Sequence, residues 1–203
     1  MNQFEKIKAA VKKADTSKII ALAGLGNTGR NATAGMVLAQ RTALDEQARE
    51  VTVIGMTDHD LFFCRTGFPE LARHLEKVTD WRYGEVLSIS KLAEVDDLIR
   101  RTDPARRIEL VFTAIHAYRV SSEVVTLTSA NAELVEALSA MKSRHSNLDI
   151  TIITQMAKIG RPHTLAPSEL KVYFAEVFPS EEFEAYYLEN NAGEAELNIH
   201  KLV

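Results

Sequence analysis

A glycine-rich turn between an apolar run and a helical pattern constrains the fold of this chain more than any other feature. Gly24, Gly26 and Gly29 form a G-x-G-x-x-G pattern directly after the apolar residues 19–23, and residues 32–44 have helical spacing. A strand, a glycine turn and a helix N-terminus together present backbone amides and the helix dipole to an anion. The pattern therefore predicts a βα unit that binds the phosphates of a nucleotide.

The alternation of apolar runs with helical patterns extends to residue 155. Strands are expected over residues 18–23, 51–56, 85–89, 108–115 and 148–154, and helices over residues 31–47, 69–78, 91–101 and 121–145, the last interrupted near Ser129. Continuously apolar strands are typical of a parallel sheet that is covered on both faces. We therefore predict an α/β fold, a doubly wound Rossmann-like parallel sheet in a three-layer α/β/α arrangement.

The two ends of the chain differ from this central pattern. Phe4, Ile7 and Val11 have helical spacing, which predicts an amphipathic N-terminal helix over residues 2–14. We assign residues 1–160 to the Rossmann-like domain and residues 161–203 to a short acidic appendage, helical or extended, because seven Glu and one Lys follow Phe174. Residues 180–183 have the pattern of a helix N-cap followed by an acidic first turn.

Composition narrows the class of protein. The 203 residues carry a net charge of −4, which argues against a nucleic-acid partner. Cys64 is the only cysteine, which fits a reducing compartment. No apolar run approaches a membrane span, and the N-terminal segment lacks the apolar core of a secretory signal. We therefore expect a cytoplasmic protein with no membrane partner.

The glycine turn fits a dinucleotide site in which each glycine has its own role. Gly24 would allow the tight turn, Gly26 the approach of a pyrophosphate, and Gly29 close packing of the helix on the sheet. Asn27 and Thr28 lie between them and are further candidate cofactor ligands. An acidic residue after the second strand would bind the ribose hydroxyls, and the candidates are Asp58 and, as the alternative, Asp60. NAD or NADP is the cofactor that this interpretation predicts.

The second half of the chain resembles the lactate/malate dehydrogenase family. The residues that carry the resemblance are 109–119, the Ser-Ala-Asn that ends at Asn131, and 148–155. In that family a strand ends at a cofactor-contacting loop, an arginine-bearing loop follows, a helix then opens with Asn-Ala, and a later strand ends in Ser/Thr-Asn-Pro. The resemblance covers roughly residues 18–156 and implies an NAD(P)-dependent oxidoreductase. It implies cofactor contacts at Thr113, Ala114, Asn131 and Thr154, and a substrate-binding role for Arg119.

The chain also departs from that family. Gln155 and Met156 stand where the family has Asn-Pro, and the second substrate-binding arginine of the family would fall at Val124 or Val125. Only 47 residues follow Met156, whereas the family's substrate domain has more than a hundred. The family's catalytic histidine has no evident counterpart. His163, after the last expected strand, is the candidate acid or base, and a structural or solvated role is the interpretation we prefer for it.

A second phosphate-binding pattern overlaps the same turn. Residues 24–33 resemble the deviant Walker loop of the ParA/MinD-type ATPases. Leu25 and Arg30 replace the two lysines of that loop, and Asn31 replaces the hydroxyl residue that holds Mg²⁺. Arginine retains the charge but not the point geometry of an ammonium group.

Three functions follow from these patterns. The leading prediction is an NAD(P)-binding protein, an oxidoreductase with a reduced substrate region. The alternatives are a nucleotide-binding or protein-interaction module without turnover, and a degenerate P-loop protein. The expected partners are the dinucleotide and an unidentified small-molecule substrate, and we also consider a homodimer through the tail or the N-terminal helix.

Overall fold

The computed structural model describes residues 3–24, 29–56, 69–82, 91–120, 123–125, 129–157, 171, 175, 178, 181–190 and 197–203. Within these residues one eight-stranded sheet has the order β3-β2-β4-β6-β1-β7-β8, and β5 pairs with β4. The strands are β1 (Ile19–Gly24), β2 (Val51–Ile54), β3 (Val78–Arg82), β4 (Arg107–Val120), β5 (Glu123–Val125), β6 (Leu148–Ala157), β7 (Phe183–Asn190) and β8 (Leu197–Lys201). The helices are α1 (Gln3–Lys13), α2 (Arg30–Leu44), α4 (Pro69–Leu75), α5 (Leu92–Arg101) and α6 (Ser129–Arg144).

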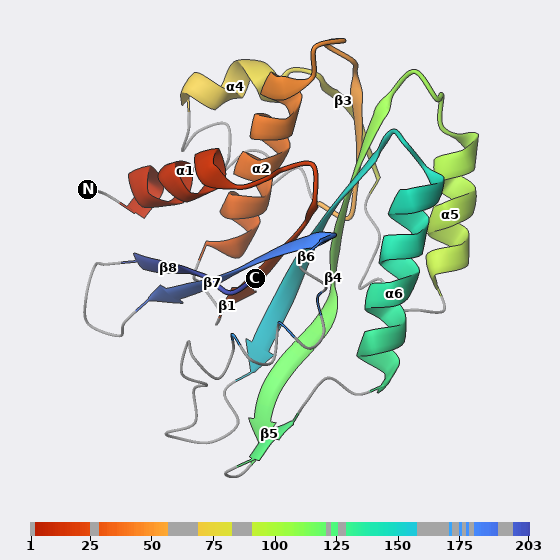
Figure 1. The fold of residues 1–203 in the computed structure, drawn as a ribbon. Coiled ribbons are helices and arrows are strands. Elements are labelled where there is room, and N and C mark those ends of the chain that lie inside the picture. The colour runs from red at the N-terminus through yellow and green to blue at the C-terminus, as the bar shows by residue number, and fades with distance from the viewer. Residues whose placement is uncertain are drawn as a thin grey trace.

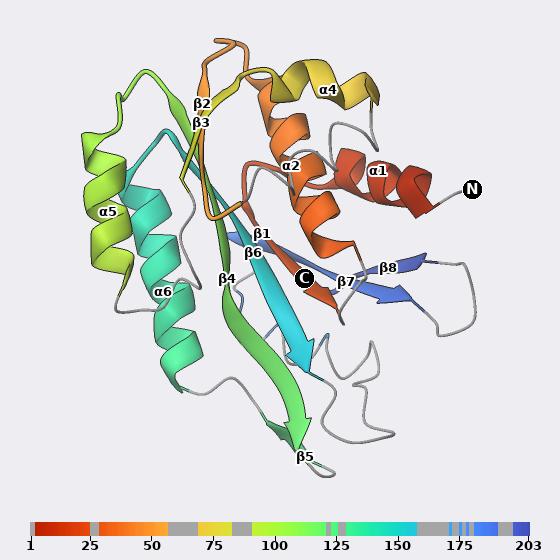
Figure 2. The same ribbon diagram turned by 180° about the vertical axis from the view of Figure 1, so that it is seen from behind.

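Helices cover both faces of the sheet. Helices α1, α2 and α4 lie on one side, and α5 and α6 lie on the other (Figures 1 and 2). All described strand pairs are parallel except β4 with β5 and β7 with β8. The predicted fold class is therefore confirmed: a mostly parallel sheet in a three-layer α/β/α arrangement. None of the described helices has the length and apolar character needed to cross a membrane.

Strand β1 shows why its sequence is continuously apolar. Ile19, Ala21 and Ala23 belong to the core between the sheet and α5 and α6. Ile20 and Leu22 belong to the core that includes α1 and α2. Successive side chains of a strand point to opposite faces, so a strand that is covered on both faces needs apolar residues at every position.

The order of the strands differs from that of the usual dinucleotide-binding sheet. In the usual order, 3-2-1-4-5-6, the first strand lies next to the second. Here β1 pairs with β6 and β7, and both β6 and β4 lie between β1 and β2. Neighbouring strands lie about 4.8 Å apart, so roughly 14 Å separates β1 from β2. The strand that follows the glycine turn and α2 is therefore remote from the strand that precedes them.

Strand β3 replaces the end of an expected helix. A helix was predicted through residue 78, but α4 ends at Leu75 and β3 begins at Val78. Val78, Thr79 and Trp81 are residue types enriched in strands, and pairing with β2 outweighs the helical spacing of the preceding residues. The strand predicted at residues 85–89 lies outside the described residues.

The helix predicted over residues 121–145 is shorter than expected. Strand β4 extends to Val120 and turns into β5, with Arg119 opposite Val124 in an antiparallel pair. Helix α6 begins at Ser129, the position of the predicted interruption. The β-branched residues Val120, Val124 and Val125 favour this hairpin over a helix.

The acidic appendage contributes two strands, β7 and β8, to the sheet. The helix start predicted at residues 180–183 is wrong, because Phe183 begins β7, which pairs in parallel with β1. Phe183, Ala185 and Tyr187 are buried in the core on the α5 and α6 side. The division of the chain at residue 160 stays a prediction.

Candidate functional site

The glycine turn begins at the carboxyl edge of the sheet. Gly24 is the last residue of β1, and its partners in register are Gln155 of β6 and Leu188 of β7. The carboxyl ends of the parallel strands meet at this edge, which is where open α/β sheets place their ligands. The turn is therefore in the position that a nucleotide site requires.

Gly29 forms the start of α2. Its φ of 78° and ψ of 20° are left-handed, a conformation that glycine adopts without the steric penalty of a Cβ. The backbone N–H and the hydroxyl of Thr33 donate to the Gly29 carbonyl at 2.8 and 2.9 Å. The first turn of α2 contains no acidic residue. No carboxylate of the helix itself therefore neutralises the positive end of the α2 dipole, which lies at this edge of the sheet.

Arg30, the first residue of α2, connects the helix to the sheet. Its Nη1 donates to the main-chain oxygen of Thr154 in β6 at 2.8 Å. The side chain is half-buried, and this burial lowers the pKa of the Arg30 guanidinium. An arginine nevertheless keeps its proton in a protein. The structure thus holds a positive charge beside the end of the glycine turn.

Thr154 lies where the ladder between β4 and β6 is irregular. Phe112 pairs with Ile152 and Ile115 pairs with Thr154, so β4 has an extra residue between these two pairs. Such bulges disrupt the local ladder and recur beside functional sites. The Thr154 side chain is fully buried, and its Oγ1 has no hydrogen-bond partner among the described residues.

The predicted ligands fall into three groups. Gly24, Gly29 and Thr154 lie together at the carboxyl edge of the sheet. The backbone of Thr113 and Ala114 forms the bulge opposite β6, Arg119 lies further along β4 in the pairing with β5, and Asn131 is the third residue of α6. The remaining predicted residues lie outside the described part of the chain: Gly26, Asn27, Thr28, Asp58 and His163. The predicted site thus stays a prediction.

Arg30 was not among the predicted dinucleotide ligands. Its position directly after Gly29 is the feature of the sequence that indicates it, because the Walker-loop pattern has a lysine there. The hydrogen bond to Thr154 joins residues 124 positions apart. No local pattern predicts such a contact, because it depends on the placement of β6 beside β1.

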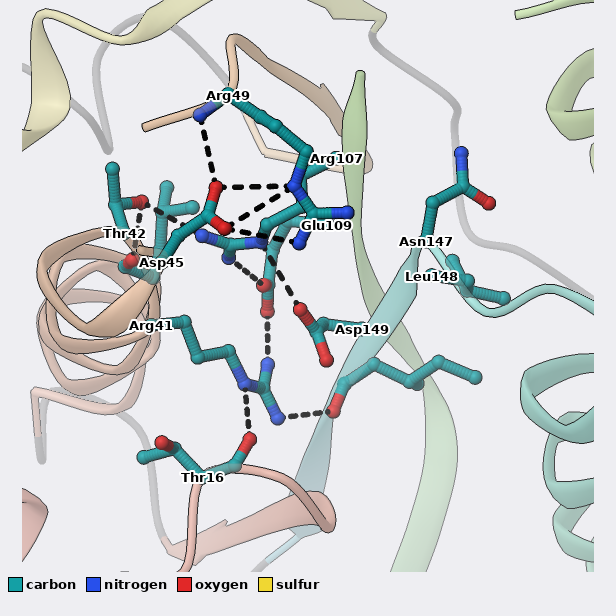
Figure 3. Close-up of polar contacts among 12 residues, drawn as sticks. Thr16, Arg41, Thr42, Asp45, Arg49, Arg107, Glu109, Asn147, Leu148 and Asp149 are labelled. Atoms are coloured by element: carbon teal, nitrogen blue, oxygen red, sulfur yellow. Dashed lines mark hydrogen bonds and ion pairs between the residues drawn. The ribbon is translucent and has the colours of Figure 1, made fainter. Parts of the chain in front are cut away.

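A second polar cluster lies at the opposite, amino edge of the sheet (Figure 3). Arg41 of α2 donates to Glu109 of β4, to the Thr151 hydroxyl at 3.0 Å and to three backbone carbonyl oxygens. Arg107 forms ion pairs with Asp149 at 3.2 Å and with Glu109 at 3.7 Å. We call Arg41, Arg107, Glu109, Asp149 and Thr151 the amino-edge cluster.

The amino-edge cluster fixes α2 on the sheet. Burial raises the pKa of Glu109, and the charges of Arg41 and Arg107 act in the opposite direction. The side chains of Arg41 and Arg107 are buried, and Glu109 is fully buried, so the charged groups of the cluster lie in the interior of the molecule. One feature of the sequence indicates this cluster: Glu109 is a charged residue inside the otherwise apolar run of residues 108–115.

A metal centre is not evident in the described part of the chain. The described residues contain no group of three or more His, Cys, Asp or Glu side chains that could hold an ion. Asn31 occupies the position at which a P-loop has a Ser or Thr for Mg²⁺. The position at which a P-loop supplies its Mg²⁺-binding hydroxyl thus carries an amide in this chain.

Comparison with known proteins relates the chain to others through its fold. No family model matches it, and no curated protein matches it by sequence. A solved ATPase domain matches with a TM-score of 0.50 and 9% identity, over 93% of this chain and 82% of that one. A structure of a DnaB-like replicative helicase and its interactions with primase matches with a TM-score of 0.46 and 10% identity, over 92% of this chain and 54% of that one.

These findings correct the dehydrogenase interpretation. The fold is one that a nucleotide-binding ATPase domain also adopts, and the predicted relation to the lactate/malate dehydrogenases is wrong. The predictions of an NAD(P)-dependent oxidoreductase and of NAD or NADP as cofactor are wrong with it. The strand order gives the physical reason, since two strands separate β1 from β2, whereas a dinucleotide sheet places the first two strands side by side.

Proposed function

We propose that this chain is a nucleoside-triphosphate-binding domain of the P-loop type. The observation that carries the proposal is the spacing of residues 24–31 on the structure. Gly24 ends β1, Gly29 and Arg30 begin α2, and four residues lie between the two glycines, as in G-x-x-x-x-G-K-[ST]. Backbone amides of the turn, the α2 dipole and the Arg30 charge would together bind phosphate oxygens.

The proposal concerns binding rather than hydrolysis. An active P-loop ATPase uses its lysine and a Mg²⁺-binding hydroxyl to stabilise the transferred phosphoryl group. Arg30 and Asn31 stand at these two positions. The chain would bind a nucleoside triphosphate and respond to it, with little or no turnover.

Isothermal titration calorimetry with ATP, ADP, AMP and NAD tests the proposal. We expect affinity to fall in the order ATP, ADP, AMP, because each lost phosphate removes charge from the loop, and we expect NAD to bind no better than AMP. Arg30→Ala should weaken ATP binding by tenfold or more. Arg101→Ala, an exposed arginine at the end of α5, is the matched control and should leave binding unchanged.

Thermal unfolding gives an independent readout of the same event. A ligand that binds the folded chain raises its melting temperature by mass action. If millimolar ATP produces neither heat nor a shift in melting temperature, the proposal is wrong. A cytoplasmic location is a further proposal, supported by the single cysteine of the chain.

A further inference from the structure

The contact between Arg30 and Thr154 gives the arginine a role that a lysine would not fill. The Arg30 fork donates to a main-chain carbonyl that belongs to the strand next to β1. That carbonyl lies beside the bulge of β4, where the regular ladder is interrupted. Arg30 therefore has a fixed acceptor on the sheet, at the edge where the proposed phosphate site lies.

An arginine can hold two acceptors at once. Its planar group carries five N–H donors in a rigid fork, and the bond to Thr154 uses one of them. A lysine places all of its donors on one nitrogen, so it contacts two acceptors only where both approach the same atom. The fork also keeps its charge although the side chain is half-buried.

We propose that Arg30 is a bridging phosphate ligand, which donates through the same guanidinium to the Thr154 carbonyl oxygen and to a phosphate oxygen of the nucleotide. This inference rests on the proposed function and goes beyond it. The Thr154 carbonyl orients the fork before the nucleotide arrives, which lowers the entropic cost of ordering a long side chain upon binding. Arginine is then the residue that this loop requires, and lysine is a poor replacement even though P-loops normally use it.

The decisive comparison is between Arg30→Lys and the wild-type chain. We expect Arg30→Lys to weaken ATP binding by at least about tenfold in calorimetry, because the ammonium group satisfies one acceptor at the expense of the other. Arg101→Lys is the matched control and should bind ATP as the wild type does. ATP affinity in Arg30→Lys that equals or exceeds the wild-type value would overturn the bridging role.

Arginine-selective ¹⁵N NMR of the full chain separates the bridge from a purely structural contact. We expect the two Nη atoms of Arg30 to show restricted rotation both without ATP and with saturating ATP, together with a shift when ATP binds. A freely rotating guanidinium in either condition would contradict the bridge. If the wild-type chain binds no ATP, the proposed function fails and this inference with it, whereas a failure confined to Arg30→Lys or to the NMR signal removes only the bridge.

Discussion

Arg41 and Glu109 form an ion pair whose side chains are 3% and 0% exposed. The pair connects α2 to β4 across the amino edge of the sheet, at the opposite end of α2 from Arg30. Helix α2 is thus held at both ends by arginines, through Arg30 to Thr154 and through Arg41 to Glu109. The two contacts fix the direction in which the helix N-terminus points.

Removal of the Glu109 carboxylate should destabilise the chain strongly. In Glu109→Ala, Arg41 and Arg107 would remain buried without their shared partner, and breaking a buried pair in this way costs about 3–5 kcal/mol. Urea unfolding followed by circular dichroism measures the change. Glu94→Gln, which removes an exposed pair with Lys91, should cost about 0.5 kcal/mol or less. Equal effects of the two substitutions would contradict the structural role of the cluster.

Two threonines of β6 should respond in opposite directions to replacement by valine. The Thr151 hydroxyl donates to Glu109 at 2.9 Å and accepts from Arg41, so Thr151→Val should cost about 1–3 kcal/mol. The Thr154 hydroxyl is buried without a described partner, so Thr154→Val should be neutral or stabilising by up to about 1 kcal/mol. Equilibrium unfolding of both variants checks the contrast, and a larger loss in Thr154→Val would show that its hydroxyl does have a partner.

Two glycines with positive φ should differ in their tolerance of alanine. Gly29 has a φ of 78°, and among the described residues an added Cβ would contact only Ile7 Cδ1, at 3.8 Å, so Gly29→Ala should cost about 1–2 kcal/mol from backbone strain. Gly55 has a φ of 92°, and its added Cβ would lie 2.1 Å from the Val111 carbonyl oxygen. Gly55→Ala should therefore cost more than about 3 kcal/mol or prevent folding. The melting temperatures of the two variants test this prediction. A melting temperature that is lower in Gly29→Ala than in Gly55→Ala would contradict it.

Stability in acid should depend on Asp96. The Arg100 guanidinium, followed by His145, holds the pKa of the Asp96 carboxyl well below its usual range. A carboxyl whose pKa is lowered by folding stabilises the folded state above its unfolded pKa of about 3.9, and this contribution is lost as the pH falls through the folded pKa. Asp96→Asn should thus lower the free energy of unfolding at pH 7 by about 1–2 kcal/mol.

The pH profile distinguishes this electrostatic effect from a loss of packing. The difference between wild type and Asp96→Asn should shrink as the pH is lowered below about 4, because the Asp96 carboxyl of the unfolded wild-type chain then takes up a proton while the folded carboxyl still keeps its charge. Urea unfolding at a series of pH values measures it. A constant difference from pH 7 to pH 2 would assign the effect to shape rather than to charge.

ATP binding should be nearly independent of Mg²⁺. Because Asn31 stands where a P-loop has its Mg²⁺-binding hydroxyl, we expect the ATP affinities in EDTA and in excess Mg²⁺ to agree within about threefold. Asn31→Thr should introduce a preference for Mg²⁺ of about tenfold, measured by the same calorimetry. A strict Mg²⁺ requirement in the wild-type chain would show that residues outside the described part supply the metal ligands.

Elements that depend on local pattern were predictable. Leu92, Val95 and Ile99 mark the buried face of α5, which the sequence placed within one residue of its observed start. Strand β3 and the β4–β5 hairpin were not predictable in the same way, because strand pairing overrides the spacing of their own residues. Strand β7 was not predicted as part of the main sheet, because its acidic residues suggest a surface segment. Glu184 in fact accepts hydrogen bonds from Tyr186, Lys201 and the Asp15 backbone.

The sequence by itself determined the local features of this protein: buried strands, amphipathic helices and a glycine turn at the start of a helix. Each depends on residues that are close in the chain, so periodicity and glycine positions are sufficient to predict it. Only the tertiary structure decided which strands flank β1, and hence that Arg30 meets Thr154 and Arg41 meets Glu109. Those contacts join residues 124 and 68 positions apart, and they depend on how the crossover helices pack on the sheet, which no short window of sequence contains.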